Sequence, residues 1–327
     1  MGSDTVLSQM VTDSMRYSTI KRTRRVLALM AMVIPAFAQI DLSGSWVALN
    51  QEDVMGRMQG PYSVDYTGLP LNEWGLARAL SYSQSQLSMP ERECAFYPPT
   101  YLVLGPFSMK IWNETEPLNG KTIAWHIGGW EDKAPQTIWI DGRPHPSKYA
   151  PHEKGGFTTG VWEGDVLVTT TTHMKAGYIR RNGAPTSDQA TMTNHFLRHD
   201  DLLTVTGWIE DPIYLTEPFY LSRTFQLEPA APMDSMGPPC VQGDEGIKEG
   251  EVPHYLPGKN PFVDELTHDY HIPAEAVMGG AETMYPEYRK KLKDKYIAPE
   301  KCVRNCGGPP GGGGRGGAAP PPVPARN

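Results

Sequence analysis

Apolar and polar residues alternate along the middle of the chain, and this period of two predicts β-strands. The clearest runs are "KTIAWHIGGW", "QTIWIDG", "DVLVTTTTH", "LLTVTGWIE" and "FYLSRTFQL". Each run is rich in the β-branched and aromatic residues that strands favour. Turn residues separate the runs at short intervals, which is typical of an antiparallel sandwich or a closed barrel. We therefore expect a mainly β protein, with an antiparallel β-barrel or sandwich as its core.

Two pairs of runs predict β-hairpins. "TTGVW" is joined to "DVLVTTTTH" by Glu163 and Gly164, a short connection of the kind that tight turns use. "ATMTNHFLRH" is joined to "LLTVTGWIE" through a polar turn around Asp200 and Asp201. These hairpins place four strands of the expected sheet in sequential order.

The segments outside the strands differ in composition and in the spacing of their apolar residues. "LNEWGLARALSYSQSQ" (71–86) has apolar residues near helical spacing and predicts a short helix before the barrel. We expect the barrel domain to span residues 39–230, with residues 231–300 as an irregular segment that wraps it. Residues 301–327 are rich in Gly and then in Pro, a composition that predicts a disordered tail.

The beginning of the chain has the features of a secretory signal peptide. A basic stretch (Lys21 to Arg25) is followed by the apolar run Val26–Pro35 and then by Ala36-Phe37-Ala38. We expect residues 1–38 to be removed by cleavage after Ala38, which places the protein in the periplasm or outside the cell. The alternative is a buried helix. The apolar run is too short for a membrane span, which needs about 20 residues, so no transmembrane segment is expected after cleavage.

Composition narrows the possible partners. The net charge is −7, without a basic face, which argues against nucleic acid as a partner. The four cysteines are Cys94, Cys240, Cys302 and Cys306, an even number that favours disulfides in an oxidising compartment. Three connectivities are possible, and we favour Cys94–Cys240 with Cys302–Cys306, leaving a metal at the second pair as an alternative. The sequence assigns no cofactor, no oligomeric state and no choice between Met1 and Met15 as the translation start.

Polar and aromatic residues are densest between Trp139 and Glu217, and we expect a functional site there. The candidate acid–base residues are His195, Asp165, Asp211 and Glu217. The candidate ligand-binding residues are Trp139, Arg143, His145, Trp162, Arg180, Arg181, Arg198 and Trp208. We expect no metal site, because no His pair has the helical spacing of a zinc protease.

His195 is the most informative candidate, because histidine transfers protons near neutral pH. The period of two places Thr191, Thr193 and His195 on one face of the strand "TMTNHFLR", and Met192, Asn194 and Phe196 on the other. If the His195 face lines the barrel, it provides a polar cavity with one titratable group. If that face meets solvent, His195 is an ordinary surface residue.

Gly44-Ser45-Trp46 resembles the opening of lipocalins and related calycins. In that fold the Trp packs across the closed end of the barrel and an Arg from a late strand stacks on it. The resemblance implies that Arg223, in "LSRTF", is this Arg. The alternative is a Trp that simply fills a β core.

Longer segments resemble a family of secreted bacterial proteins. They are "IWIDGRPHP", the "WEGD" hairpin, "RRNGAPTSD", "RHDDLLTV", "DPIYLTEP", "VPHYLPGKNPF" and "GGAETMYPEY". The resemblance covers about Cys94 to Tyr288, and it implies kinship without implying an activity.

Three functions are compatible with these features. The first, which we favour, is a barrel that binds a small, partly apolar molecule. The second is a hydrolase, isomerase or lyase in which His195 works with a carboxylate. The third is a structural protein of the cell envelope.

Overall fold

The structure is a computed structural model that describes residues 40–49, 62–83, 88, 98–102, 108–128, 136–231, 249–250, 252–293 and 297. The chain forms two units, Met1–Ile40 and Asp41–Asn327, and every element below belongs to the second unit. The expected signal peptide, the four cysteines with their expected pairing, and the Gly/Pro-rich tail lie outside the described residues. Within the described part, none of the helices is both long enough and apolar enough to cross a membrane.

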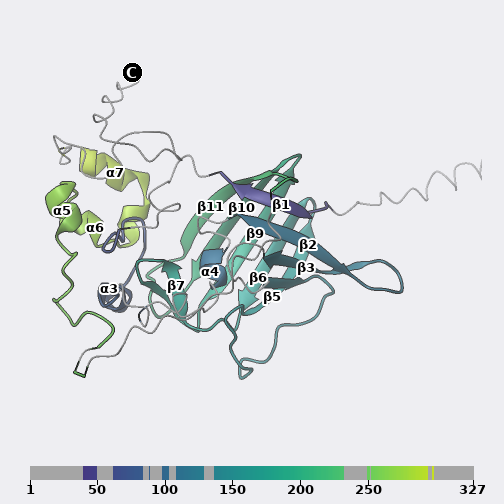
Figure 1. Ribbon diagram of the computed structural model, residues 1–327, viewed down its shortest axis with the longest axis horizontal. Coiled ribbons are helices and arrows are strands. Elements are labelled where there is room, and N and C mark those ends of the chain that lie inside the picture. The colour runs from purple at the N-terminus through teal and green to yellow at the C-terminus, as the bar shows by residue number, and fades with distance from the viewer. Residues whose placement is uncertain are drawn as a thin grey trace, which may run out of the picture. The chain divides into compact units, whose positions relative to one another are not determined.

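The centre of the protein is a closed β-barrel of nine strands (Figure 1). Around the barrel the order is β1-β11-β10-β9-β6-β5-β4-β3-β2, and β2 closes on β1. The strands are β1 (Gly44–Ala48), β2 (Met109–Thr115), β3 (Thr122–Gly128), β4 (Gln136–Trp139), β5 (Phe157–Glu163), β6 (Val166–Thr172), β9 (Thr191–His199), β10 (Leu202–Glu210) and β11 (Phe219–Leu227). The expected mainly β class and the barrel are confirmed, and the barrel fits a lipocalin-like architecture.

One strand pair departs from the expected antiparallel arrangement. β4 and β5 are parallel, with Ile138 opposite Thr158. A parallel pair cannot be joined by a tight hairpin, so residues 141–156 carry the chain back to the level at which β4 began. Asp141 and Gly142 form a turn at the start of this crossover rather than the turn of a hairpin.

Alternation along the strands separates the inside of the barrel from its outer face. On β9 the buried residues are Met192, Asn194 and Phe196, and on β11 they include Phe219, Arg223 and Phe225. The residues between them are half-buried or exposed. The apolar members of this alternation pack in the barrel core, and their burial accounts for most of the favourable free energy of the fold.

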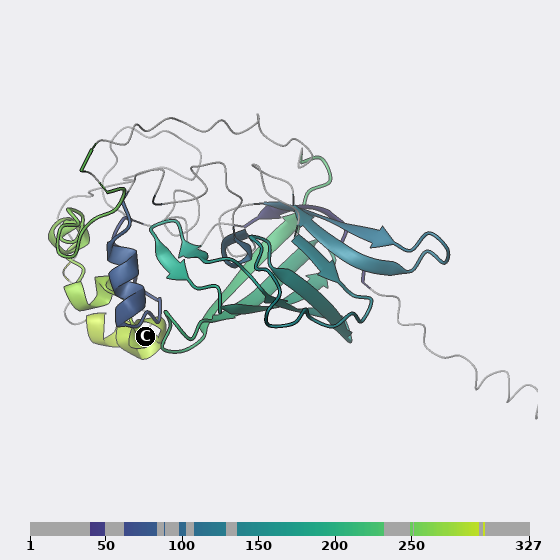
Figure 2. The same cartoon turned by 90° about the horizontal axis from the view of Figure 1, so that it is seen from below.

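Short elements lie outside the barrel sheet. β7 (Gly177–Arg180) and β8 (Ala184–Thr186) form a separate two-stranded sheet, visible in Figure 2. The helices are α3 (Glu73–Leu80), α4 (Pro99–Leu102), α5 (Glu265–Asp269), α6 (Ala274–Val277), α7 (Pro286–Lys293) and the 3-10 helix η3 (Ala281–Met284). The expected helix before the barrel is therefore present as α3, shorter than the pattern indicated.

Helix α3 begins where the sequence provides a cap. Asn72 accepts a hydrogen bond from the Gly75 backbone N–H at its side-chain oxygen, which satisfies one free donor of the first turn. Gly75 then lies against the backbone of Tyr214, where an added Cβ would stand 2.5 Å from the carbonyl oxygen. Glycine at this position lets the helix pack directly on the segment that follows β10.

Candidate functional site

A group of polar side chains lies inside the barrel. Gln136 donates from Nε2 to the hydroxyl oxygens of Thr158 (3.0 Å) and Thr171 (3.3 Å), and these two hydroxyls are 2.8 Å apart. All three residues are buried, and they come from β4, β5 and β6. On the neighbouring strand pair, Asn194 of β9 is buried opposite Thr169 of β6. We call Gln136, Thr158, Thr169, Thr171 and Asn194 the interior polar patch.

Within the part of the chain that the structure describes, two acceptors of this patch and one nearby donor have no hydrogen-bond partner. They are Gln136 Oε1, Asn194 Oδ1 and the indole Nε1 of Trp125 on β3. All three side chains are at least nine-tenths buried. A buried polar group without a partner costs about 1–3 kcal/mol, and native proteins rarely leave several of them together. The arrangement therefore provides two hydrogen-bond acceptors and one donor inside a barrel whose other buried side chains are mostly apolar, with the Arg223 guanidinium as a charged exception.

The position of Asn194 depends on a glycine in the neighbouring strand. Gly207 on β10 lies directly opposite Asn194. An added Cβ at Gly207 would stand 2.2 Å from Asn194 Oδ1, so only glycine allows the amide to lie over β10. Neither Asn194 nor Gln136 was a candidate in the sequence. The sequence signal for Asn194 was an amide on the same strand face as Met192 and Phe196. The signal for Gln136 was an amide on the same strand face as Ile138.

His195 lies on the outer face of β9, the second of the two alternatives. Its ring is tilted against Trp208 on β10, with centroids 5.2 Å apart, and Trp208 in turn lies 5.7 Å from the ring of Tyr220 on β11. The structure thus brings together two predicted site residues, His195 and Trp208, but places them outside the barrel. Among the described residues, no carboxylate forms a hydrogen bond or ion pair with His195.

Asp211 is buried just after β10, and its carboxylate accepts four hydrogen bonds. The donors are the backbone N–H and the hydroxyl of Ser187 (2.6 and 2.8 Å) and the backbone N–H groups of Ile213 and Tyr214 (2.9 and 3.3 Å). These bonds fasten the end of the β7–β8 sheet to the turn after β10. The acid–base role of Asp211 stays a prediction. Its four hydrogen bonds are of the kind by which a buried carboxylate stabilises a turn.

The "RRNG" turn contacts the segment before α3. Arg180 donates to the Thr67 carbonyl (3.0 Å), and Asn182 donates to the carbonyls of Tyr62 (3.2 Å) and Asp65 (2.7 Å). Gly183, with φ +85°, packs so closely on Tyr82 that an added Cβ would stand 2.2 Å from it. Arg181 is half-buried beside this turn. The turn therefore holds residues 62–82 in place.

Arg198 lies at the Trp46 end of the barrel. Its guanidinium lies over the Trp46 ring at 5.3 Å, and it also donates to the carbonyls of Asp41 and Asp200. The expectation that Arg223 stacks on Trp46 is wrong. Arg223 instead lies over Phe225 at 5.3 Å inside the barrel. The reason is the position of each residue along β11. Trp46 is paired with Leu227, whereas Arg223 lies four residues earlier on the same strand and is paired with Val205.

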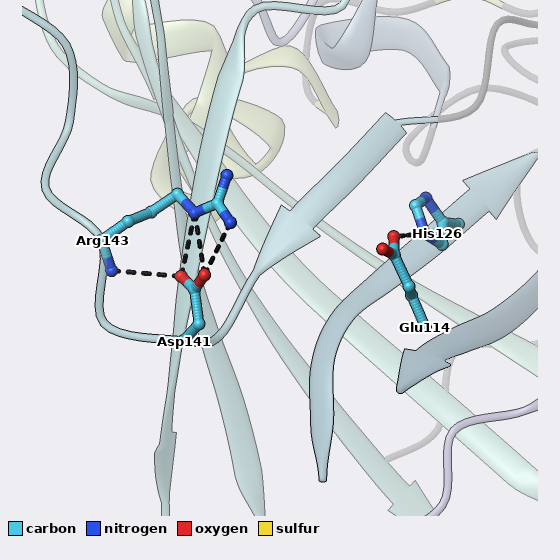
Figure 3. Close-up of polar contacts among 4 residues, drawn as sticks. All are labelled: Glu114, His126, Asp141 and Arg143. Carbon is cyan, nitrogen blue, oxygen red and sulfur yellow. Dashed lines mark hydrogen bonds and ion pairs between the residues drawn. The ribbon is translucent and has the colours of Figure 1, made fainter. Parts of the chain in front are cut away.

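Two predicted ligand-binding residues, Trp139 and Arg143, meet at the end of β4. The guanidinium of Arg143 lies 3.4 Å above the ring of Trp139. Figure 3 shows how Asp141 holds it, through three bonds of 2.6–3.0 Å from Nε and Nη2. These bonds lower the pKa of Asp141 below its usual range and raise that of Arg143. The Arg143 charge is therefore already paired within the chain.

Next to this turn, a histidine and a carboxylate are in contact on the outer face. His126 Nε2 lies 3.1 Å from Glu114 Oε2, and its Nδ1 lies 3.1 Å from the Thr137 hydroxyl (Figure 3 shows the first contact). The Trp112 ring stacks on His126 with centroids 5.4 Å apart. Three neighbouring strands, β2, β3 and β4, place these residues side by side. None of them was a candidate in the sequence, because the pairing of β2 with β3 could not be read from spacing.

His145 attaches the crossover segment to the barrel wall. Its Nε2 lies 2.7 Å from the Thr159 hydroxyl and its Nδ1 lies 2.8 Å from the Thr172 hydroxyl. The Thr172 hydroxyl also lies 2.8 Å from Nδ1 of His173, whose Nε2 donates to the Ser147 carbonyl (2.9 Å). When both rings are neutral, every proton in this chain has one acceptor. Burial lowers the pKa of His145, and the nearby His173 lowers it further.

This lowered pKa predicts a loss of stability in acid. Above about pH 6.5, the usual pKa of histidine, the ring is neutral in both the folded and unfolded states. As pH falls below this value, the unfolded state binds a proton first, so the free energy of unfolding decreases until the folded ring titrates. We expect the urea midpoint to fall more between pH 7.5 and 5.5 in the natural chain than in His145→Gln. His199→Gln, at an exposed ring, is the control, and equal losses in all three chains would contradict the prediction.

The remaining candidates lie apart from one another. Asp165 is exposed in the turn between β5 and β6, and Trp162 on β5 faces the barrel interior with an unpartnered indole N–H. Glu217 accepts a hydrogen bond from the Tyr285 hydroxyl at 2.5 Å, which raises the pKa of Tyr285. Among the described residues, no group of three or more metal-ligating side chains is close enough to hold a metal ion.

The fold is a closed β-barrel with a patch of buried polar side chains in its interior. Comparisons with family models, curated proteins and solved structures found no match to this chain.

Proposed function

We propose that this protein binds a small, neutral, partly apolar molecule inside the barrel, at the interior polar patch. The observation that carries the proposal is the set of unpartnered atoms, Gln136 Oε1, Asn194 Oδ1 and Trp125 Nε1. Two acceptors and one donor call for a ligand with N–H or O–H donors and at least one acceptor. The apolar side chains on the same strand faces favour an apolar body.

The ligand is expected to be neutral because of the cost of burying charge. An ion placed in an apolar interior needs an opposite charge and further hydrogen bonds. The patch itself consists only of amides and hydroxyls, which hold neutral polar groups well. An alcohol, phenol or amide with a hydrocarbon part has this chemistry.

The enzyme alternative has less support. It required His195 and a carboxylate in the same pocket, whereas His195 lies on the outer face and its ring contact is with Trp208. The His–carboxylate contact between His126 and Glu114 is also on the outer face. The described residues therefore favour binding over acid–base chemistry within the barrel.

Substitution of the patch should remove binding without unfolding the protein. We expect Asn194→Leu and Gln136→Met, which roughly keep volume, to weaken binding by about 5- to 100-fold each, the loss of one hydrogen bond to a buried group. The measurement is native mass spectrometry of the full chain after incubation with a mixture of small neutral alcohols, phenols and amides. Asn119→Ala, at an exposed amide in the turn between β2 and β3, is the control.

Two results would count against the proposal. Equal occupancy in the natural chain and both patch variants would place any ligand elsewhere. No bound molecule in the natural chain across the whole mixture would remove the support for binding itself. Urea unfolding of each variant checks that the fold is kept. Gln136→Met also removes the hydrogen bonds to the buried Thr158 and Thr171 hydroxyls, so we expect it to lower the free energy of unfolding by about 1–3 kcal/mol.

A further inference from the structure

An aromatic strip crosses the outer face of the barrel over β9, β10 and β11. It consists of His195, Trp208 and Tyr220, whose neighbouring rings are 5.2 and 5.7 Å apart, and of Tyr285, whose hydroxyl donates to Glu217, three residues before Tyr220 in the chain. The side chains at the far end are open to solvent: Tyr220 is 56% exposed and Tyr285 is 47% exposed. Exposed aromatic rings in a row are unusual on a protein surface and mark an interaction site.

The strip is bordered by acidic groups. Glu217 accepts the Tyr285 hydroxyl at Oε1, and among the described residues its other oxygen makes no hydrogen bond. Glu210, on the same face of β10 as Trp208, is exposed. A partner of this surface should therefore be apolar and rigid along the rings and basic at one end.

A segment of this chain has that chemistry. Residues 321–326 read "PPVPAR", a P-x-x-P-x-R pattern formed by Pro321, Pro324 and Arg326. Pro-rich segments of this kind adopt the polyproline II helix, and they bind rows of aromatic side chains at low entropic cost because the helix is already formed. An arginine two residues further on pairs with a carboxylate.

Charge also favours contact between this tail and the rest of the chain. Residues 301–327 contain four basic and no acidic side chains. Removing those four from the 30 basic residues of the chain leaves 26 basic against 37 acidic in residues 1–300. The basic tail and the acidic body therefore attract each other, an effect that salt weakens.

The tail is long enough to reach the strip. Tyr285 immediately precedes α7, and Ile297 is held near His271 by a hydrogen bond of 3.0 Å. Ile297 and Pro321 are 24 residues apart. A chain of this length that follows random-coil statistics spans about 27 Å on average. Attachment by such a linker gives the tail an effective concentration near the millimolar range.

We propose that residues 321–326 lie across the aromatic strip as a polyproline II helix. Pro321 and Pro324 pack on Trp208 and Tyr220, and Arg326 pairs with Glu217. The site is on the outer face, so it is independent of ligand binding inside the barrel.

Photo-crosslinking of the full chain tests this proposal. p-Benzoylphenylalanine replaces Ala325, and the crosslinked peptides of the monomer are identified by mass spectrometry. We expect crosslinks to the peptides that contain Trp208, Tyr220 or Tyr285. Tyr220→Ser should lower their yield by roughly two- to tenfold, the loss of one aromatic contact, and Arg326→Ala or added salt should also lower it.

Controls keep the experiment decisive. Tyr149→Ser removes a still more exposed tyrosine on the crossover segment and should leave the yield unchanged. Crosslinks found only in a dimer would assign the strip to a second copy and overturn the proposal. Crosslinks to other regions, a yield that Tyr220→Ser does not change, or no crosslink at all would overturn it too.

Discussion

Trp46→Ala is expected to lower the free energy of unfolding by about 3–5 kcal/mol, the usual cost of removing a buried large aromatic side chain. Trp46 is 0% exposed, and its indole N–H donates to the Leu42 carbonyl at 2.9 Å. The substitution removes apolar contacts inside the barrel and the surface on which Arg198 stacks. It also leaves the Leu42 carbonyl without its donor.

Urea unfolding of Trp46→Ala and Trp74→Ala measures this effect with a matched control. Trp74 is 76% exposed on α3, so its removal should change stability by less than about 0.5 kcal/mol. A small loss for Trp46→Ala, similar to that of the control, would contradict the placement of Trp46 in the barrel core.

The second large effect is expected for Asp211→Ala. Asp211 is 4% exposed and accepts four hydrogen bonds, two of them from Ser187. Removing the carboxylate leaves these donors without an acceptor, and hydrogen bonds to a charged group contribute about 1.5–3 kcal/mol each. Because some donors will find water, we expect a loss of about 3–5 kcal/mol, at the upper end for single substitutions.

Asp165 offers a control of the same residue type. It is exposed in the turn between β5 and β6, so Asp165→Ala should change stability little. Thermal and urea unfolding of both variants compare a buried with an exposed carboxylate. Unchanged stability of Asp211→Ala would show that the four hydrogen bonds do not stabilise the turn. It would then favour the predicted acid–base role of Asp211 over a structural one.

The sequence predicts the strands well because each strand carries its own pattern. β11 was expected at Phe219 to Leu227 and has these bounds, and both predicted hairpins are present. The pattern does not say which face of a strand is inside. On β9 either face carried a polar residue, and the larger apolar side chains of Met192 and Phe196 decided that Asn194, rather than His195, faces the interior.

Long-range pairing was beyond the sequence. The parallel pairing of β4 with β5 has no local signal, since Asp141-Gly142 is compatible with a hairpin as well as with the start of a crossover. The expected barrel was therefore confirmed while this connection was not foreseen.

The polar motifs were interpreted as site residues, but many of their contacts fasten remote segments to one another. Asn182 holds residues 62–65, and Thr216 donates to the Pro70 carbonyl at 2.9 Å. The 62–72 segment is held from its other side by the region of α6 and η3, where Tyr66 donates to Val277. Contacts between segments more than 100 residues apart depend on the folded topology, so spacing alone could not separate structural from functional polar residues.

A crystal structure of the protein purified with its ligand tests the central claim most directly. We expect electron density for a small molecule inside the barrel, with donors within about 3.2 Å of both Gln136 Oε1 and Asn194 Oδ1. Density that shows both oxygens bonded only to ordered water or to rotated side chains of the protein would contradict it.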